Sequence, residues 1–548
     1  MATAAPPDQA DVVVVGGGPT GLAAALELGR RGVRCAVVEP RREISELRPR
    51  AKTTSVRTME HFRRWGLAGE LRAAAYIPVE WSQDVVFCTN LLGVEITRFT
   101  GCFGLTSVPS PLFAETSQQV PQFVVEQVLR EAVAAEPSCT TAYGWSASSV
   151  VERAGEVSVG VLGPTGEVSE IRGTYVLGCD GAASVVRPAV GAVYAGTVDV
   201  RQNLTAVFRA PGLAERVPHG PAIQYWVLQP GASAYMGRLD LGDRWWIGLI
   251  GVPGALAEDQ VRTCIRLAVG APLDVEVLGT DPWTSRMLVA DRFASERVLL
   301  CGDAAHLNPP WGGHGFNTGV GDAVNAAWKL AAVLGGWGGS ALLDAYEKDR
   351  RPVIERTVAL AARHSALLSA DFAAPILFED SATGAAARAK AAEDIEAKKH
   401  DEFHGLGLVL GYHYEGSPIV AAEPPAAEPP AAESPAGGPG DGDVSRYVPS
   451  ARPGHRLPHA WLGASESLYD RLGPWFTVLR VGDADPGPLV AAARRRRLPL
   501  RVEDVRDRRL DLGAPLLVVR PDQHVAWRGP DARGADEVVD TVRGARRP

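Results

Sequence analysis

A glycine-rich turn near the start of the sequence has the spacing needed to hold a pyrophosphate. Residues 11–15 (DVVVV) are apolar and β-branched, which predicts a buried parallel strand. GGGPTG follows at once, so Gly16, Gly18 and Gly21 complete a G-x-G-x-x-G pattern. In such a turn the first glycine permits the tight bend, the second lets the backbone approach phosphate, and the third lets helix and strand pack closely. We therefore expect an anion at the N-terminus of the next helix.

The segment after this turn completes a βαβ unit. Residues 22–32 (LAAALELGRRG) predict a helix, and residues 33–40 (VRCAVVEP) predict a second strand that ends in Glu39. A carboxylate at that position accepts hydrogen bonds from a ribose diol and repels a 2′-phosphate. The unit thus favours FAD or NAD over NADP, and by itself it does not separate the first two.

Two further turns each follow a buried strand and carry an aspartate. YVLGCDG leads to Asp180, and RVLLCGD leads to Gly302 and Asp303. The carboxyl ends of strands are where open α/β sheets bind ligands, and a carboxylate there suits a polyol such as ribitol. The loop at 309–317 (PPWGGHGFN) has glycines at 312, 313 and 315 whose free φ lets backbone N–H groups meet a flat ring. The helix after it directs its positive end at that ring, which favours a flavin.

In order and spacing, these three turns resemble the class A flavoprotein monooxygenases, the aromatic hydroxylases that include p-hydroxybenzoate and phenol hydroxylases. The resemblance implies an α/β fold: a Rossmann-like FAD-binding domain, an antiparallel β-sheet substrate domain and a thioredoxin-like C-terminal domain. It places Arg50 near the pyrophosphate, Gln122 and Asp303 at the ribityl chain, and residues 309–317 along the isoalloxazine. The full set of implied FAD-binding residues is Gly16, Gly18, Pro19, Thr20, Gly21, Glu39, Arg41, Arg50, Gln122, Asp180, Gly302, Asp303, Pro310, Gly313, Gly315, Phe316 and Asn317.

Residues 190–285 alternate between apolar and polar types, which predicts antiparallel strands. In the family such a sheet covers the active site and presents its inner face to substrate. Alternate residues of a strand face opposite sides, so about half of the strand candidates are expected to face away. Trp311 stands where a smaller residue is familiar in the family, and could narrow the site, stack on substrate or simply pack. The candidate lining residues are Gln224, Trp226, Tyr235, Arg238, Trp246 and Trp311.

The expected domains follow from these patterns. Residues 1–189 and 286–420 form the FAD-binding domain, which has a helical end, and residues 190–285 form the β-sheet domain. Residues 421–443 are rich in Pro, Ala and Glu, which is typical of a linker. Residues 444–548 resemble the thioredoxin-like domain of the phenol and polyketide hydroxylase branches. No cysteine follows Cys301, so this domain lacks the thiols that dithiol chemistry requires.

The resemblance also implies a reaction. NADH or NADPH reduces FAD, the reduced flavin takes up O₂, and a flavin C4a-hydroperoxide hydroxylates an electron-rich ring. We expect a polycyclic phenol of the polyketide type, as in antibiotic biosynthesis, because the C-terminal domain accompanies that branch. The alternatives are Baeyer–Villiger insertion or oxidative ring cleavage of a polycyclic natural product, then indolic substrates, a flavin-binding protein without turnover, or an NAD-dependent dehydrogenase. No catalytic acid or base is assigned, because His306 and His314 beside the loop are more often structural.

Composition limits the partners. The net charge of −8 argues against nucleic acid, which usually leaves a basic footprint. The first ten residues resemble no secretion signal, and no apolar run approaches the roughly 18 residues of a membrane span. Seven scattered cysteines without a C-x-x-C pair fit free thiols in a reducing compartment rather than a metal site. We expect a cytoplasmic monomer or homodimer that binds no metal or membrane.

Overall fold

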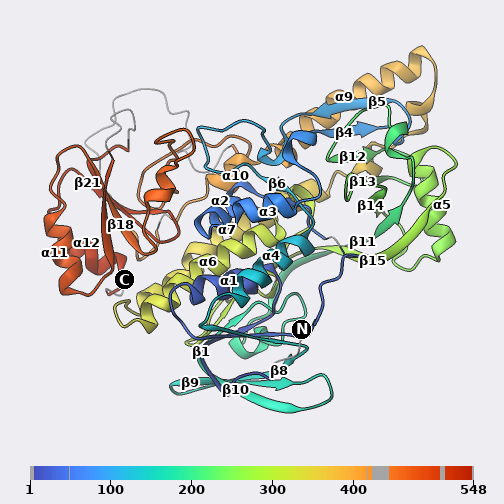
Figure 1. The fold of residues 1–548 in the computed structure, drawn as a ribbon. Coiled ribbons are helices and arrows are strands. Elements are labelled where there is room, and N and C mark those ends of the chain that lie inside the picture. Colours follow the sequence, from blue (N-terminus) through green and yellow to red (C-terminus); the bar gives the residue numbers. More distant parts are fainter. Residues whose placement is uncertain (1–4, 49, 415, 422–442, 506–511, 546–548) are drawn as a thin grey trace.

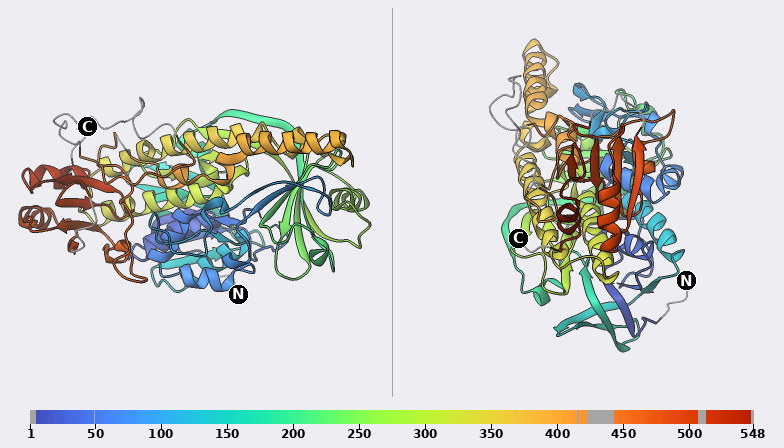
Figure 2. Two further views of the ribbon diagram at one scale, coloured as in Figure 1. Left: turned by 90° about the horizontal axis from the view of Figure 1, so that it is seen from above. Right: turned by 90° about the vertical axis from the view of Figure 1, so that its left-hand side faces the viewer.

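The computed structural model describes residues 5–48, 50–414, 416–421, 443–505 and 512–545. Three bodies surround a central stack of helices: a mixed sheet at the bottom of Figure 1, a large and mostly antiparallel sheet at the right, and the C-terminal domain at the left. From above, the molecule is elongated, and the C-terminal domain and the large sheet lie at opposite ends (Figure 2). The expected α/β class is confirmed. The expected linker at 421–443 lies almost wholly outside the described residues.

The first sheet, called the dinucleotide sheet here, carries the glycine-rich turn. Its order is β7-β2-β1-β10-β9-β8, and β16 also pairs with β10. The pairs β7–β2, β2–β1, β1–β10 and β10–β16 are parallel. Residues 12–15 are almost fully buried, which explains their continuous apolar character. The strands are β1 (Gln9–Val15), β2 (Cys35–Glu39), β7 (Cys139–Tyr143), β8 (Ser146–Arg153), β9 (Glu156–Leu162), β10 (Val168–Gly178) and β16 (Val298–Leu300).

Helices cover this sheet and link the three bodies. The helix α1 follows the glycine-rich turn and packs against α6, which follows the loop at 309–317 (Figure 1). A short antiparallel pair, β3 with β6, lies between α1 and α4 in the chain. The elements are α1 (Pro19–Gly29), β3 (Thr53–Thr54), α2 (Val56–Arg64), α3 (Ala68–Ala74), β6 (Gln118–Gln119), α4 (Gln122–Ala134), α6 (Gly315–Leu334), α7 (Ala341–Ser365), α8 (Ser369–Phe372) and α10 (Leu406–Leu410).

The second sheet, called the large sheet here, has eight strands in the order β17-β15-β11-β14-β13-β12-β4-β5. One face packs against α5 (Glu258–Val269), and the other, the inner face, packs against Trp311 and α9 (Ala382–Phe403). The strands are β4 (Val85–Cys88), β5 (Glu95–Phe99), β11 (Tyr194–Arg209), β12 (Gln224–Val227), β13 (Ala234–Arg238), β14 (Arg244–Ile250), β15 (Glu276–Ala290) and β17 (His306–Leu307).

The domain boundaries expected around this sheet need correction. The strands β4 and β5 precede residue 190, and α9 follows residue 285, yet all three belong with the large sheet (Figure 1). The physical reason is that β4 pairs in parallel with β12, a partner more than a hundred residues away. A strand pattern identifies the strand but does not identify its neighbour.

The C-terminal domain has a four-stranded sheet in the order β19-β18-β20-β21, with two helices. Buried charges join it to the central helices: Arg520 donates to Asp349 of α7 at 2.8 Å, and Lys329 of α6 donates to the same carboxylate at 2.7 Å. Removing one partner of such a buried ion pair would leave the other charge without solvent or counter-ion, which is strongly destabilising. These pairs therefore hold the C-terminal domain against the central helices. Its elements are β18 (Phe476–Val481), α11 (Gly487–Arg495), β19 (Leu500–Val505), β20 (Leu516–Val519), β21 (Val525–Gly529) and α12 (Ala535–Val542).

Within the described ranges, no helix combines the length and the apolar character needed to cross a bilayer.

Candidate flavin and substrate site

The glycine-rich turn is shaped by close backbone contacts. Gly16 has φ +106°, and a Cβ there would lie 2.2 Å from the carbonyl oxygen of Cys179. A Cβ on Gly21 would lie 1.9 Å from the carbonyl oxygen of Gly16. Around Gly18, by contrast, a Cβ would meet nothing within 4 Å. The turn therefore has two glycines that packing demands and one that faces open space, and this arrangement fits a pyrophosphate approaching Gly18.

Glu39 lies beside this turn and helps to hold it. Its Oε2 accepts a hydrogen bond from the Gly17 N–H at 2.7 Å, and its Oε1 accepts from the backbone N–H and the Nε of Arg41 at 2.9 and 2.7 Å. Arg41 also pairs with Glu126 of α4 at 3.2 Å. This shaping of the turn adds to the predicted ribose contact. Oε2 retains a lone pair for a ribose hydroxyl.

The three turns meet at one edge of the dinucleotide sheet. The first approaches the second where Gly16 contacts Cys179, directly before Asp180. The first also approaches the third, because a Cβ at Gly302 would lie 2.8 Å from the Thr20 hydroxyl oxygen. The strands β1, β10 and β16 are parallel neighbours, so their carboxyl ends had to coincide.

The two aspartates of these turns present carboxylate oxygens near this edge. Asp180 accepts backbone N–H bonds from Val185 and Val186 through Oδ2, while its buried Oδ1 has no hydrogen-bond partner among the described residues. Burial raises the pKa of Asp180. The surrounding protein partly desolvates the Asp303 carboxylate and raises its pKa, although the side chain reaches solvent. The positive charges of His306 and Arg50 act in the opposite direction but do not outweigh this desolvation. Arg50 is thus close to Asp303, in keeping with the placement that the resemblance implies.

The loop at 309–317, called the flavin loop here, turns sharply between η5 (Gly302–Ala304) and α6. Pro310 is exposed and precedes a short 3₁₀ turn, η6 (Trp311–Gly313). Gly312 and Gly313 have φ of 76° and 69°, which a side chain would strain. Gly315 does not share this geometry. It begins α6 in an ordinary helical conformation, so the conformational freedom of glycine is used at positions 312 and 313 only.

Asn317 fastens the flavin loop to β3. Its Nδ2 donates to the carbonyl oxygens of Thr53 and Gly313 at 2.9 and 2.7 Å, and its Oδ1 accepts from the Ser55 N–H at 2.9 Å. Both Nδ2 donors and one lone pair of Oδ1 are engaged in positioning the loop. Phe316 is buried in the core of the dinucleotide sheet. Phe316 and Asn317 were predicted to line the isoalloxazine directly. In the structure they instead support the flavin loop through packing and hydrogen bonds.

Gln122 and Pro19 each begin a helix. Pro19 occupies the first turn of α1, where a missing N–H costs nothing. The Gln122 N–H donates to the Ala51 carbonyl at 2.9 Å, and its side chain donates to Glu126 at 2.9 Å. Gln122 therefore adjoins the segment that leads from Arg50 into β3.

The aromatic wall, as it is called here, consists of Trp311 of the flavin loop and four residues on the inner face of the large sheet: Trp226, Tyr235, Trp246 and Trp283. Trp311 is 2% exposed and its ring centroid lies 5.3 Å from Tyr235, 5.7 Å from Trp226 and 6.0 Å from Trp283. Tyr235 in turn lies 5.5 Å from Trp246. Trp311 thus packs against the sheet residues that were predicted to line the site. Gln224 belongs to the same face and accepts from the Trp226 Nε1 at 3.2 Å.

Arg238 is the exception among the predicted lining residues. It is three residues after Tyr235 on β13 and so faces the opposite side of the sheet. Its guanidinium lies over Trp81 and Trp245 and donates to the carbonyl oxygens of Asp240 and Gly242. Arg238 therefore braces a turn on the far face, and its prediction as a lining residue is wrong.

Comparison with known proteins places this geometry in a family. Residues 9–361 match the family described as "FAD binding domain", and residues 450–545 match "Aromatic-ring hydroxylase, C-terminal". The chain belongs to the class A flavoprotein monooxygenases. A "putative polyketide hydroxylase" from Streptomyces halstedii is 31% identical over 97% of this chain and 95% of its own.

Solved structures agree. The rebeccamycin biosynthetic enzyme RebC with reduced flavin is similar at a TM-score of 0.88 and 32% identity, over 98% of this chain and 100% of its own. Aklavinone-11 hydroxylase with FAD and aklavinone is similar at a TM-score of 0.79 and 26% identity, over 97% and 98% of the two chains. The predicted family, the FAD cofactor and the activity class are confirmed: the protein is an FAD-dependent monooxygenase.

Sequence reasoning missed charged residues behind the aromatic wall of this monooxygenase. On α9, Lys399 and Glu402 form a buried ion pair, and the Lys399 Nζ lies 4.6 Å from the Trp226 ring centroid. Burial raises the pKa of Glu402. The i,i+3 spacing of the two residues was visible, but on an alanine-rich helix such a pair is typical of a solvated face. Lys52, beside β3, also contacts the wall.

Two histidines, His306 and His314, lie beside the flavin loop. His306 is buried and bonded through Nε2 to Asp322 at 2.8 Å, which is a structural role. His314 is buried, and burial lowers its pKa to about 4. In the part of the chain that the structure describes, no group of three or more His, Cys, Asp or Glu side chains could hold an ion.

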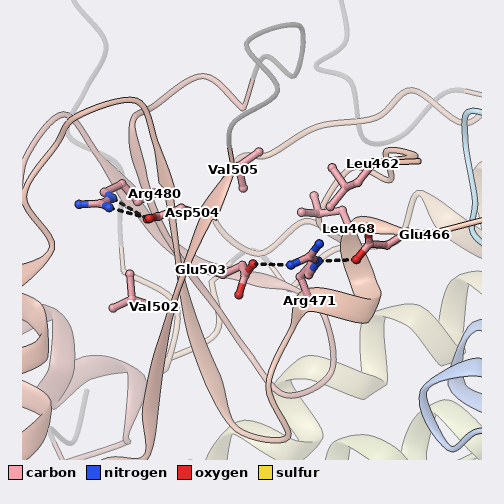
Figure 3. A pocket seen from close by; sticks show the side chains of 9 residues that line it. All are labelled: Leu462, Glu466, Leu468, Arg471, Arg480, Val502, Glu503, Asp504 and Val505. Atoms are coloured by element: carbon pink, nitrogen blue, oxygen red, sulfur yellow. Dashed lines mark hydrogen bonds and ion pairs between the residues drawn. The ribbon is translucent and has the colours of Figure 1, made fainter.

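A separate hollow of about 690 Å³ lies in the C-terminal domain, away from the flavin loop. Figure 3 shows that its charged side chains pair with one another: Arg480 with Asp504, and Arg471 with Glu466 and Glu503. Because these charges already compensate one another, this hollow is a weaker candidate for a ligand site than the aromatic wall.

Proposed function

We propose that this monooxygenase hydroxylates a planar polycyclic phenol of the polyketide type, with NADH or NADPH as electron donor and O₂ as co-substrate. The observation that carries the proposal is the direct packing of Trp311, in the flavin loop, against Tyr235 and Trp226 of the large sheet. Flat apolar rings favour a flat aromatic substrate through stacking and burial. The printed names of two relatives, a putative polyketide hydroxylase and aklavinone-11 hydroxylase, support this substrate class.

The residues divide the work between cofactor and substrate. FAD, when bound, would carry electrons from the nicotinamide donor to O₂. The open space at Gly18 suits the pyrophosphate, and the exposed carboxylate of Asp303 suits ribityl hydroxyls. Asn317 holds the flavin loop in register with β3. The aromatic wall orients the substrate and keeps water away from the reacting atoms, and both conditions favour oxygen transfer over release of peroxide.

Stopped-flow absorbance of the holoenzyme with NADH or NADPH tests the proposal, with and without hydroxylated naphthols and anthraquinones. We expect flavin reduction that accelerates when a substrate is bound, followed in ¹⁸O₂ by a phenolic product with one heavy oxygen. Comparison of kcat/KM for the two donors identifies the preferred one. Ring-expanded lactones or cleaved rings would instead establish the insertion or cleavage chemistry. Flavin bound but never reduced by either donor would contradict turnover altogether.

A further inference from the structure

Lys52 places a cation against the aromatic wall. It lies between Arg50, near Asp303, and Thr53, whose carbonyl accepts the Asn317 amide. Its Nζ lies 3.8 Å from the ring centroid of Trp246. Only six of the 56 basic side chains of the sequence are lysines and the rest are arginines, so a lysine at this position stands out.

This ammonium group lacks a counter-ion. Among the described residues, no carboxylate forms an ion pair with the Lys52 Nζ, and its one polar interaction is the contact with the Trp246 ring. Burial alone lowers the pKa of Lys52 to about 7. Lys399, the other lysine at the wall, differs because Glu402 compensates its charge. A cation that is partly desolvated and uncompensated becomes more stable when an anion binds beside it.

Lys52 lies close to both the flavin loop and the aromatic wall. A Cβ on Gly313 of the flavin loop would lie 3.4 Å from Thr53, the residue that follows Lys52. Trp246 lies 5.5 Å from Tyr235, which in turn contacts Trp311. Lys52 therefore stands at the end of the aromatic wall nearest to β3, close to the flavin loop.

We propose that Lys52 is a specificity-determining residue that pairs with an anionic oxygen, a carboxylate or an ionised phenol, at the end of the polycyclic substrate that lies against Trp246. The inference rests on the proposed function and specifies that the polycyclic substrate carries a negatively charged oxygen. The contact with the Trp246 ring holds the Lys52 amino group at the wall before substrate arrives, and the protonated form gains a cation–π attraction there. The anionic oxygen then supplies the missing counter-ion, and the pair fixes which end of the flat ring system points away from the reacting atoms.

Calorimetry on the FAD-loaded enzyme at pH 8 tests this with two matched probes, 9,10-anthraquinone-2-carboxylate and 9,10-anthraquinone-2-carboxamide. We expect the wild type to bind the carboxylate at least about tenfold more tightly than the amide, since charge-assisted bonds to a partly buried cation are strong. Buffers of different ionisation enthalpy should show uptake of close to one proton with the carboxylate, because Lys52 is largely neutral at pH 8 before it binds. Repeating the titration with the phenol 2-hydroxyanthraquinone distinguishes the two sources of anionic oxygen.

Variants decide the assignment. Lys52→Met keeps the length of the side chain and should abolish both the preference and the proton uptake, while affinity for the amide stays within about twofold of wild type. Lys52→Arg should keep the preference without the proton uptake, and Lys348→Met, at an exposed lysine of α7, should behave as wild type. A carboxylate preference that survives in Lys52→Met overturns the proposal, as does equal binding of the probes by the wild type. A change in FAD affinity without a change in preference would assign Lys52 to the flavin instead. Failure of the wild type to bind either anthraquinone overturns the proposed function, and the inference with it.

Discussion

The edge of the dinucleotide sheet and the aromatic wall are built from different parts of the chain's chemistry. At the edge, backbone atoms set the geometry: Gly16 lies against the carbonyl of Cys179, and Gly21 against that of Gly16. At the wall, side chains from β12, β13, β14, β15 and the flavin loop meet through their rings. The edge suits a cofactor with fixed phosphates and hydroxyls. The wall suits a substrate that is recognised by shape.

This difference predicts how each region responds to change. A Cβ added to Gly16 would lie 2.2 Å from the Cys179 carbonyl oxygen, so a single added methyl group should disrupt the edge. Rings whose centroids lie 5.3 to 5.7 Å apart can rearrange around a smaller side chain. The loss in the free energy of unfolding then depends on the volume of the cavity that remains. The two regions should therefore be separable by mutation, one through cofactor binding and the other through substrate use.

The largest effect is expected at Gly16. Gly16→Ala places a Cβ against the Cys179 carbonyl at a φ of +106°, where alanine is strained. We expect a loss of more than about 3 kcal/mol in the free energy of unfolding and no measurable FAD binding. Thermal unfolding and flavin fluorescence of the purified protein measure both.

Gly18→Ala is the matched control, two residues away. Gly18 has φ −78°, and its added Cβ would meet nothing within 4 Å. This variant should fold as stably as wild type and lose only FAD affinity, because the methyl group enters the space left for the pyrophosphate. Equal instability in the two variants would contradict the distinction between a packed and an open glycine.

The next effect is expected at Trp311, where the wall meets the flavin loop. Trp311→Ala removes a ring that is 2% exposed and contacts three others, so the free energy of unfolding should fall by about 3 to 5 kcal/mol. FAD should still bind, because the three turns at the edge are untouched. Water admitted to the wall should divert oxygen from product to peroxide, measured as the ratio of product to NAD(P)H consumed. Trp311→Phe should lower the free energy of unfolding and the product ratio by smaller amounts. A Trp311→Ala protein that binds no flavin would contradict the separation of edge and wall.

The same contrast explains what the sequence could predict. Each turn at the edge is a contiguous run of sequence, so the local pattern identified Gly16, Asp180 and Asp303 as candidates, and the family resemblance gave their roles. The wall draws on segments remote in sequence. Trp226 and Tyr235 were identified as aromatic residues of predicted strands, but Lys52 and Glu402 reach the wall from other elements, and nothing in their local pattern distinguishes them from surface charges.

The domain boundaries failed for a related reason. The strand β4 lies within residues 1–189, which were predicted as part of the FAD-binding domain, but it pairs with β12 of the large sheet. Pairing between distant strands depends on three-dimensional neighbours that periodicity does not encode. Asn317 shows the same limit at the level of one residue, since its hydrogen bonds to Thr53 and Ser55 span more than two hundred residues.

The smallest effect is expected at Arg238, and it tests whether strand direction decides membership of the wall. Arg238→Ala removes two side-chain hydrogen bonds to a turn on the far face, so it should cost about 1 to 2 kcal/mol in stability. It should leave KM and the product ratio unchanged, because the side chain faces away from the flavin loop. Tyr235→Ala, on the same strand but directed inward, should raise KM at least about tenfold through lost ring contact. Since the two residues are only three apart, an altered KM in Arg238→Ala would mean that β13 presents both faces to substrate, and the wall would have to be redrawn across the sheet.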